Sequence, residues 1–140
     1  MVYEAKNYDS LLGTAGFSDQ LLKNHFQLYK GYVDNTNKLL EVLMSMLQEG
    51  TTTPAFAEMK RRFAWEFNGM RLHELYFDNM SRQPSKPGSL VTKQLAAQFG
   101  SFEQWEKAFK AVGAMRGIGW VVLAYDPQGK KFFNLWINEH

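Results

Sequence analysis

The sequence contains no cysteine, which excludes disulfides, thiolate metal ligands and cysteine nucleophiles. It also has no apolar run close to the roughly 20 residues of a membrane span, and no secretory signal at its start. The sequence has no large excess of either charge, because it contains 16 Lys and Arg and 14 Asp and Glu. A dedicated nucleic-acid surface carries a clustered positive excess. We therefore expect a cytoplasmic globular protein that binds neither nucleic acid nor membrane.

Phosphate-binding glycine loops and a Gly-x-Ser-x-Gly nucleophile motif are absent too. What the 140 residues do contain is 45% hydrophobic and 15% aromatic side chains, which is enough for a packed core. This length suits one domain, or two small subdomains that share a core.

Two long helical patterns fill the first part of the chain. Ser18 has the side chain of a helix N-cap, and Thr53 followed by Pro54 marks a second helix start. The inward stripe of the first helix is predicted from a three- and four-residue spacing: Leu21, His25, Leu28, Tyr29, Tyr32, Thr36, Leu39, Leu40, Leu43 and Leu47. The second helix carries His73 on its inward side. The pattern predicts a helical-hairpin subdomain over residues 1–82.

Residues 83–88 are predicted to be a linker, because two prolines and a glycine interrupt the pattern. Short helices are expected at about 89–98 and 102–112, the second with a capping box formed by Ser101 and Gln104. Strand-forming residues at 119–125 and 131–138 flank a turn at 126–129 and predict an antiparallel β-hairpin. The expected class is α+β, with a small α/β subdomain at 89–140. A two-stranded sheet is marginal alone, so the edge at 131–138 is a candidate pairing surface for another segment or chain.

His25 and His73 are the candidate metal ligands, since facing helices can bring two neutral imidazoles to one level. The alternative is that each is a hydrogen-bonded core histidine. Tyr32 follows His25 by seven residues and so returns to nearly the same side of the helix, where it is either beside a metal or an ordinary core tyrosine. Trp120, close to two glycines, forms either the wall of a small pocket or part of the core.

Taken in order, the motifs resemble the iron/manganese superoxide dismutase family from about Tyr8 to His140. The segments that carry the resemblance are His25, Tyr32-Val33, Asn37-Lys38-Leu39, Phe67-Asn68, His73-Glu74-Leu75-Tyr76-Phe77, Phe99-Gly100-Ser101-Phe102-Glu103, Gly117-Ile118-Gly119-Trp120 and Asp126-Pro127-x-Gly129. The resemblance implies a helical hairpin followed by an α/β subdomain with a three-stranded sheet. It also implies one Fe or Mn ion held by three His and one Asp, with superoxide as substrate and O₂ and H₂O₂ as products.

By this resemblance, His25 and His73 are the first two metal ligands and Tyr32 is the gateway tyrosine. Trp120 is the aromatic wall, and His140 is the outer-sphere partner of the metal-bound water. The family also suggests a homodimer, formed through the family contact or through the open strand edge. Lys30 is a candidate for attracting the superoxide anion.

Two departures from the family pattern matter. The family usually has eight residues between the first ligand and the tyrosine, whereas this chain has seven; a register held from Tyr32 puts Asn24 at the ligand position. We prefer His25, the better metal donor. In addition, no Asp-x-Trp-x-x-x-His segment, which carries the other two ligands, occurs before His140. Gly69 stands where iron enzymes typically have Gln.

The resulting hypothesis is a superoxide dismutase-like metalloprotein whose site is incomplete within this chain. Two alternatives stay open. One is a degenerate, non-catalytic homologue that binds metal weakly or binds a partner, and the other is a structural helical hairpin without metal.

Overall fold

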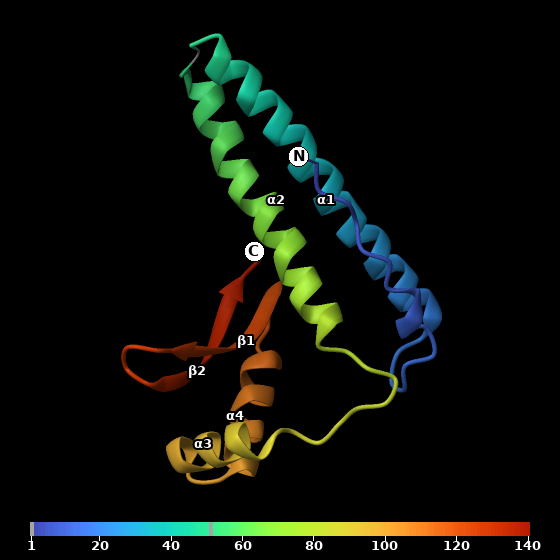
Figure 1. The fold of residues 1–140 in the computed structure, drawn as a ribbon, viewed down its shortest axis with the longest axis vertical. Helices are drawn as coiled ribbons and strands as arrows, with labels where there is room; N and C mark the ends of the chain where they lie inside the picture. The colour runs from blue at the N-terminus through green and yellow to red at the C-terminus, as the bar shows by residue number, and fades with distance from the viewer. Residues whose placement is uncertain (1, 51) are drawn as a thin grey trace. The chain divides into compact units, whose positions relative to one another are not determined.

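A computed structural model describes residues 2–50 and 52–140. The chain divides into two compact units, Met1–Pro84 and Ser85–His140, each with its own architecture. The first unit is helical, whereas the second combines helices with a β-hairpin (Figure 1). This arrangement confirms the predicted α+β class.

The first unit is a helical hairpin. A short 3-10 helix, η1 (Asp9–Leu11), precedes two long antiparallel helices, α1 (Asp19–Gln48) and α2 (Pro54–Asp78) (Figure 1). Ser18 caps α1 as predicted, because its Oγ accepts a hydrogen bond from the Leu21 N–H at 3.2 Å. Pro54 opens α2 at a position where a backbone N–H has no helical partner to lose.

The face that α1 turns inward differs in part from the predicted stripe. Its buried residues are Leu22, Tyr29, Val33, Thr36 and Leu43. Leu21, Leu28 and Leu47 were expected to point inward, but each is 53% exposed, so this part of the prediction is wrong. One residue step turns the helix by about 100°, so the burial of Leu22 places the neighbouring Leu21 on a different side of α1.

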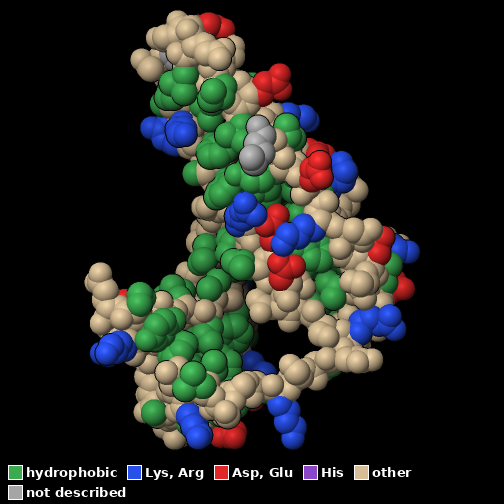
Figure 2. Space-filling model, in the orientation of Figure 1, with side chains coloured by type: hydrophobic (Ala, Val, Ile, Leu, Met, Phe, Trp, Pro, Cys, Tyr) green, Lys and Arg blue, Asp and Glu red, His purple; other side chains and the backbone are tan. Residues whose placement is uncertain are grey.

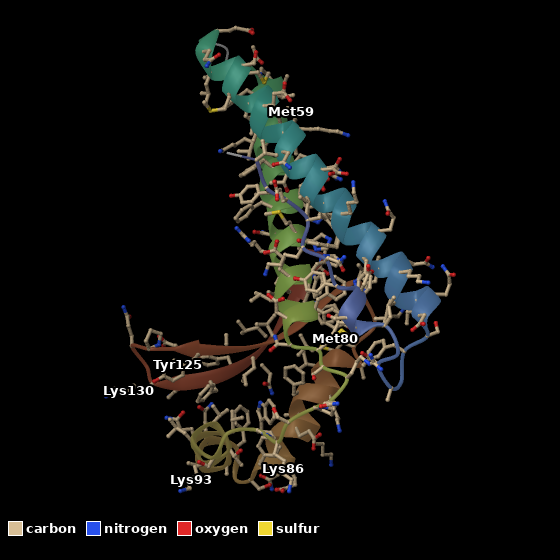
Figure 3. The ribbon with its side chains drawn as sticks, turned by 45° about the vertical axis from the view of Figure 1, so that its right-hand side comes forward. Met59, Met80, Lys86, Lys93, Tyr125 and Lys130 are labelled. Carbon is tan, nitrogen blue, oxygen red and sulfur yellow. The ribbon has the colours of Figure 1, made fainter. Side chains whose placement is uncertain are left out.

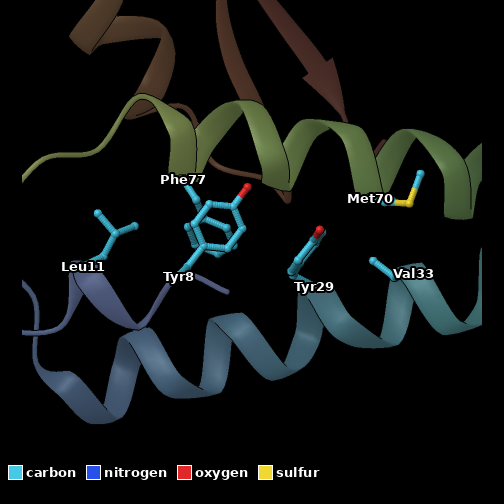
Figure 4. Packing of buried hydrophobic residues seen from close by; sticks show 6 residues of the cluster. All are labelled: Tyr8, Leu11, Tyr29, Val33, Met70 and Phe77. Atoms are coloured by element: carbon cyan, nitrogen blue, oxygen red, sulfur yellow. The ribbon is translucent and has the colours of Figure 1, made fainter. Parts of the chain in front are cut away.

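Residues 3–11, called the strap from here on, bind along the hairpin. Tyr3 pairs its backbone N–H and C=O with the side-chain amide of Asn37, at 2.9 and 2.8 Å. The strap also contributes to a buried cluster whose members are Tyr8, Leu11, Tyr29, Val33, Met70 and Phe77 (Figure 4). The strap, α1 and α2 therefore share one core.

The second unit places two helices beside a two-stranded sheet. The elements are α3 (Ser89–Phe99), α4 (Phe102–Gly113), β1 (Gly119–Asp126) and β2 (Lys131–Asn138). The strands pair antiparallel, with Val122 opposite Leu135. Ser101 caps α4 by accepting the Gln104 N–H at 3.1 Å, which confirms one half of the expected capping box.

The turn between the strands forms as the sequence predicted. The Asp126 carboxylate accepts the backbone N–H groups of Gln128 and Gly129, both at 3.0 Å. Lys130 completes the turn with a φ of 52° and lies with Tyr125 at this end of the hairpin (Figure 3). The local Asp–Pro–Gln–Gly chemistry thus sets the register of the sheet.

The outer edge of β2 is not fully open. The amide of Gln98 on α3 donates to the Phe132 carbonyl at 2.6 Å and accepts the Phe132 N–H at 2.8 Å. The Gln98 side chain thus satisfies the backbone groups that a neighbouring strand would otherwise bind at Phe132. Natural proteins commonly cover the edge strands of their sheets in this way. The prediction of a free pairing edge along 131–138 is therefore wrong at that residue.

Charges of both signs are interspersed on the face of the molecule seen in Figure 2. No helix among the described residues is both long and apolar enough to cross a membrane. The pattern on that face agrees with the nearly balanced composition of the whole chain.

Candidate metal centre

His25 on α1 and His73 on α2 meet inside the first unit. Their ring centroids are 4.9 Å apart and the ring planes are inclined at 81°. His25 is half-buried, whereas His73 is 2% exposed. The hairpin therefore brings the two predicted ligand residues together at one level.

The helix itself fixes the orientation of His73. The Nδ1 atom lies 2.6 Å from the carbonyl oxygen of Gly69, four residues earlier on α2. A carbonyl only accepts, so we assign the proton to Nδ1, and Nε2 then carries the lone pair. Metal-binding histidines commonly have this arrangement, because the bond to one nitrogen orients the other toward the ion.

Tyr32 lies beside the same imidazole, with ring centroids 5.1 Å apart. This contact depends on Gly69, since a Cβ atom there would come within 2.6 Å of the Tyr32 ring. Gly69 therefore has two roles at the site: its carbonyl orients His73, and its missing side chain leaves room for Tyr32.

The surroundings of His25 are aromatic. Tyr76 and Phe77 lie 5.4 and 5.0 Å from the His25 ring, measured between centroids. Burial disfavours the charged imidazolium and lowers the pKa of His25 below its ordinary value. The neutral form, which is the form that binds metals, is favoured as a result.

Asn24, the alternative ligand in the seven-residue register, has a different environment. It is exposed, and its Oδ1 accepts a hydrogen bond from Gln20 one turn earlier at 2.8 Å. Its side chain is thus engaged along the surface of α1, while His25 contacts His73.

A charged cluster next to the histidines was not foreseen from the sequence. Glu74, 7% exposed, accepts from Arg71 at 2.5 Å and from the Tyr29 hydroxyl at 3.0 Å. The Tyr29 oxygen in turn accepts the backbone N–H of Lys6 at 3.1 Å. Burial, with a smaller contribution from Glu74, raises the pKa of Tyr29 to about 12. We call Lys6, Tyr29, Arg71 and Glu74 the Glu74 clamp.

The two remaining predicted site residues belong to the second unit and contact each other. The indole Nε1 of Trp120 donates to the Nδ1 of His140 at 3.2 Å and to the Glu139 carbonyl at 2.8 Å. An accepting Nδ1 leaves the His140 proton on Nε2. Trp120 therefore orients the imidazole of His140.

The residues present fit a metal site in part. Two neutral imidazoles, one of them oriented by a backbone carbonyl, are suitable donors for Fe or Mn. Within residues 2–50 and 52–140, however, no three or more His, Cys, Asp or Glu side chains are grouped so that they could hold an ion. The described part of the chain thus brings two candidate ligands together and lacks a complete ligand set.

Comparisons with known proteins find relatives for most of the chain. Residues 87–140 match the family model for iron/manganese superoxide dismutases, C-terminal domain. The chain is 34% identical over 130 residues to "Superoxide dismutase [Fe]" of Cupriavidus metallidurans, covering 89% of this chain and 64% of that protein. These matches, which together cover most of the chain, support the iron/manganese superoxide dismutase family.

Other relatives in the superoxide dismutase family carry different metal names. "Superoxide dismutase [Mn] 2" of Haloferax volcanii is 29% identical, with 95% of this chain and 66% of that protein aligned. "Superoxide dismutase [Mn/Fe]" of Aeropyrum pernix is 30% identical, with 87% and 59% aligned. The chain spans about three fifths of the length of the curated relatives it matches.

Proposed function

We propose that this chain supplies two imidazole ligands, His25 and His73, to a mononuclear Fe or Mn centre that dismutates superoxide. The observation that carries the proposal is the approach of the two rings to 4.9 Å, with the Nδ1 of His73 committed to the Gly69 carbonyl. The names of the relatives, which include Fe, Mn and Mn/Fe dismutases, support the choice of metal.

In the proposed reaction, two superoxide anions and two protons give one O₂ and one H₂O₂. When bound, the metal ion supplies the one-electron change of oxidation state. Tyr32, beside His73, would hold a proton on its hydroxyl for transfer toward the reduced product. The indole of Trp120 orients the imidazole of His140 within the second unit, and their roles as aromatic wall and outer-sphere partner stay predictions of this proposal.

The expected role of Lys30 in attracting superoxide is weakened by its contacts. Its Nζ lies 2.9 Å from the carboxylate of Asp34, one turn later on α1. Because the neighbouring negative charge offsets the lysine, the field of Lys30 at a distance is reduced. The cytoplasmic location, an antioxidant role and a homodimer stay predictions of this proposal.

A second candidate function is a non-catalytic homologue that binds metal weakly or binds a partner. The specific observation in its favour is that the described residues contain no third ligand side chain grouped with the two histidines. A site with two imidazoles and no carboxylate would hold a divalent ion weakly, and its ligand charge would not set a useful potential.

Metal content tests the proposal directly. We expect protein purified without chelator to retain Fe or Mn near one ion per chain, measured by elemental analysis, and to consume superoxide faster than the same amount of free ion. Retained metal far below one ion per chain, or of mixed identity and without activity, would favour the non-catalytic homologue.

Three variants give the control. His73→Ala and His25→Ala should each abolish metal retention, whereas Asn24→Ala, an exposed neighbour on α1, should retain it. If Asn24→Ala lost the metal and His25→Ala retained it, Asn24 and not His25 would stand at the ligand position. Wild-type metal content in His73→Ala would overturn both metal-binding functions. Far-ultraviolet circular dichroism checks that each variant is folded.

A further inference from the structure

Helix α2 buries two carboxylates eight residues apart, and both bridge to α1. Glu66, 2% exposed, is bound by Arg62 and accepts from the Asn35 amide at 3.3 Å. Glu74, 7% exposed, is bound by Arg71 and by the Tyr29 hydroxyl. The two groups are alike in residue type and burial, and both carry an arginine from α2 and a partner from α1.

The two bridges differ in what their α1 partner touches. Tyr29 packs its ring against His73, with centroids 6.3 Å apart and planes inclined at 29°. We infer that the Glu74 clamp positions His73 through the ring of Tyr29, so that Tyr29 and Glu74 are positioning residues of the candidate metal centre. This inference rests on the proposed function.

The hydroxyl of Tyr29 is held from two directions. It donates to Glu74 on α2 at 3.0 Å and accepts the Lys6 N–H of the strap at 3.1 Å. The ring itself also contacts Tyr8 and Phe77, at centroid separations of 5.7 and 6.1 Å. Packing alone would keep the ring in the core, but the two hydrogen bonds fix its tip and therefore the surface that it offers to His73.

Arg71 connects the clamp back to the strap. Its guanidinium binds Glu74 and lies over the rings of Tyr3 and Phe67, 5.3 and 5.5 Å from their centroids. Tyr3 is itself paired with Asn37 of α1 through two hydrogen bonds between the Tyr3 backbone and the Asn37 side-chain amide. The buried charge of Glu74 is thus compensated, and the strap, α1 and α2 are held together at the level of the histidines.

The chain offers a matched control for each of the two positioning residues, Tyr29 and Glu74. Tyr8, in the same buried cluster, donates its hydroxyl to Asp78 at 3.1 Å, so Tyr8→Phe mimics the chemistry of Tyr29→Phe. Glu66→Gln likewise mimics Glu74→Gln. A merely structural role predicts equal effects within each pair, whereas a positioning role predicts effects at His73 for Tyr29→Phe and Glu74→Gln alone.

The test uses the full chain and Mn²⁺ as the probe. Binding is measured from the electron paramagnetic resonance signal of free Mn²⁺, and stability from urea unfolding. Loss of an outer-shell partner typically weakens metal affinity by about 10- to 100-fold, and we expect Tyr29→Phe to fall in that range. Glu74→Gln keeps an acceptor for the hydroxyl, so a smaller loss is expected. Tyr8→Phe and Glu66→Gln should bind like wild type.

A second measurement needs no metal. Proton chemical shifts of the His73 ring depend on the ring current of Tyr29, so they should move in Tyr29→Phe and stay in place in Tyr8→Phe. Unchanged His73 shifts and unchanged Mn²⁺ affinity in Tyr29→Phe and Glu74→Gln would overturn the inference alone. Equal losses in the Glu66→Gln and Tyr8→Phe controls would overturn it too, as a general effect of stability. Failure of the wild type to bind Mn²⁺ would overturn the proposed function together with this inference.

Discussion

The two units of this chain bury very different kinds of side chain. The interior of the first unit holds His73, Glu66, Glu74 and Thr36 among its aromatic residues, whereas in the second unit, all of whose residues are described, only Leu95 is buried. Burying a carboxylate is costly unless it is paired, and both buried glutamates have an arginine and a partner across the hairpin. Specific side-chain pairs therefore determine the arrangement of the first unit.

The second unit relies on polar contacts at less buried positions. The indole of Trp105 donates to the Asn134 side chain at 3.0 Å, Gln98 binds the edge of β2, and Trp120 binds His140. Such contacts contribute less than close packing, because water competes for each partner. The geometry of the candidate ligands is therefore fixed within the first unit, whereas the contact of Trp120 with His140 lies in a unit with a single buried residue.

The largest expected effect comes from removing the single buried residue of the second unit. Leu95→Ala should cost about 2–5 kcal/mol, the usual range for a buried leucine, and should unfold the second unit first. Tryptophan fluorescence during urea unfolding measures this, because three of the four tryptophans, Trp105, Trp120 and Trp136, lie in that unit.

The control for Leu95→Ala is Leu22→Ala, which makes the same change at a residue that is 1% exposed in the first unit. It should lower the urea midpoint at which the long helices unfold, measured by far-ultraviolet circular dichroism. The midpoint of the tryptophan fluorescence change, which reports on the second unit, should stay the same. If Leu95→Ala moved both signals equally, the two units would share one cooperative core and the contrast between them would be wrong.

A smaller effect is expected where the first unit has no spare space. Gly69→Ala would place a Cβ atom 2.6 Å from the Tyr32 ring, and overpacking of this kind typically costs about 1–3 kcal/mol. The matched control is Gly31→Ala on α1, where a Cβ would meet nothing within 4 Å. There the higher helix propensity of alanine should stabilise the protein by roughly 0.5–1 kcal/mol. If urea unfolding showed that both substitutions change the free energy of unfolding in the same direction, close packing at Gly69 would be contradicted.

Sequence reasoning succeeded where the signal is local. Ser18, Pro54 and Ser101 mark helix starts because a cap or a missing N–H acts within one turn, and the strand expected at 119–125 forms as Gly119–Asp126. It failed where a contact joins distant segments. The Tyr29–Glu74 bond spans 45 residues, and neither residue carries a local mark of it.

The difference between local signals and long-range contacts also explains which residues of the candidate site could be predicted. Helical periodicity suggested that His25, Tyr32 and His73 face inward, because the spacing depends only on residues within a few turns. The spacing does not fix which neighbouring leucine is buried, and Leu22 is buried where Leu21 was expected inside. The three-residue spacing of Arg71 and Glu74 indicated an ion pair along α2, but it did not point to Tyr29 as a third partner.

The smallest expected effect concerns the surface attachment of the strap. Asp78 binds the Lys6 ammonium at 2.9 Å and accepts the Tyr8 hydroxyl at 3.1 Å. The hydrogen bond from Lys6 is the main cause that lowers the pKa of Asp78 in the folded state.

A lowered pKa of Asp78 means that the stabilisation is present above the unfolded-state pKa and is lost as the pH falls below about 4. The difference in urea midpoint between wild type and Asp78→Asn should therefore be measurable at pH 7 and smaller at pH 3. Asp34→Asn, whose Lys30 partner is on the same helix, should give a smaller gap at pH 7, because it attaches no second segment. A gap for Asp78→Asn that persisted unchanged at pH 3 would show that the carboxylate charge does not hold the strap, and the buried contacts of Tyr8 and Tyr29 would then account for its attachment.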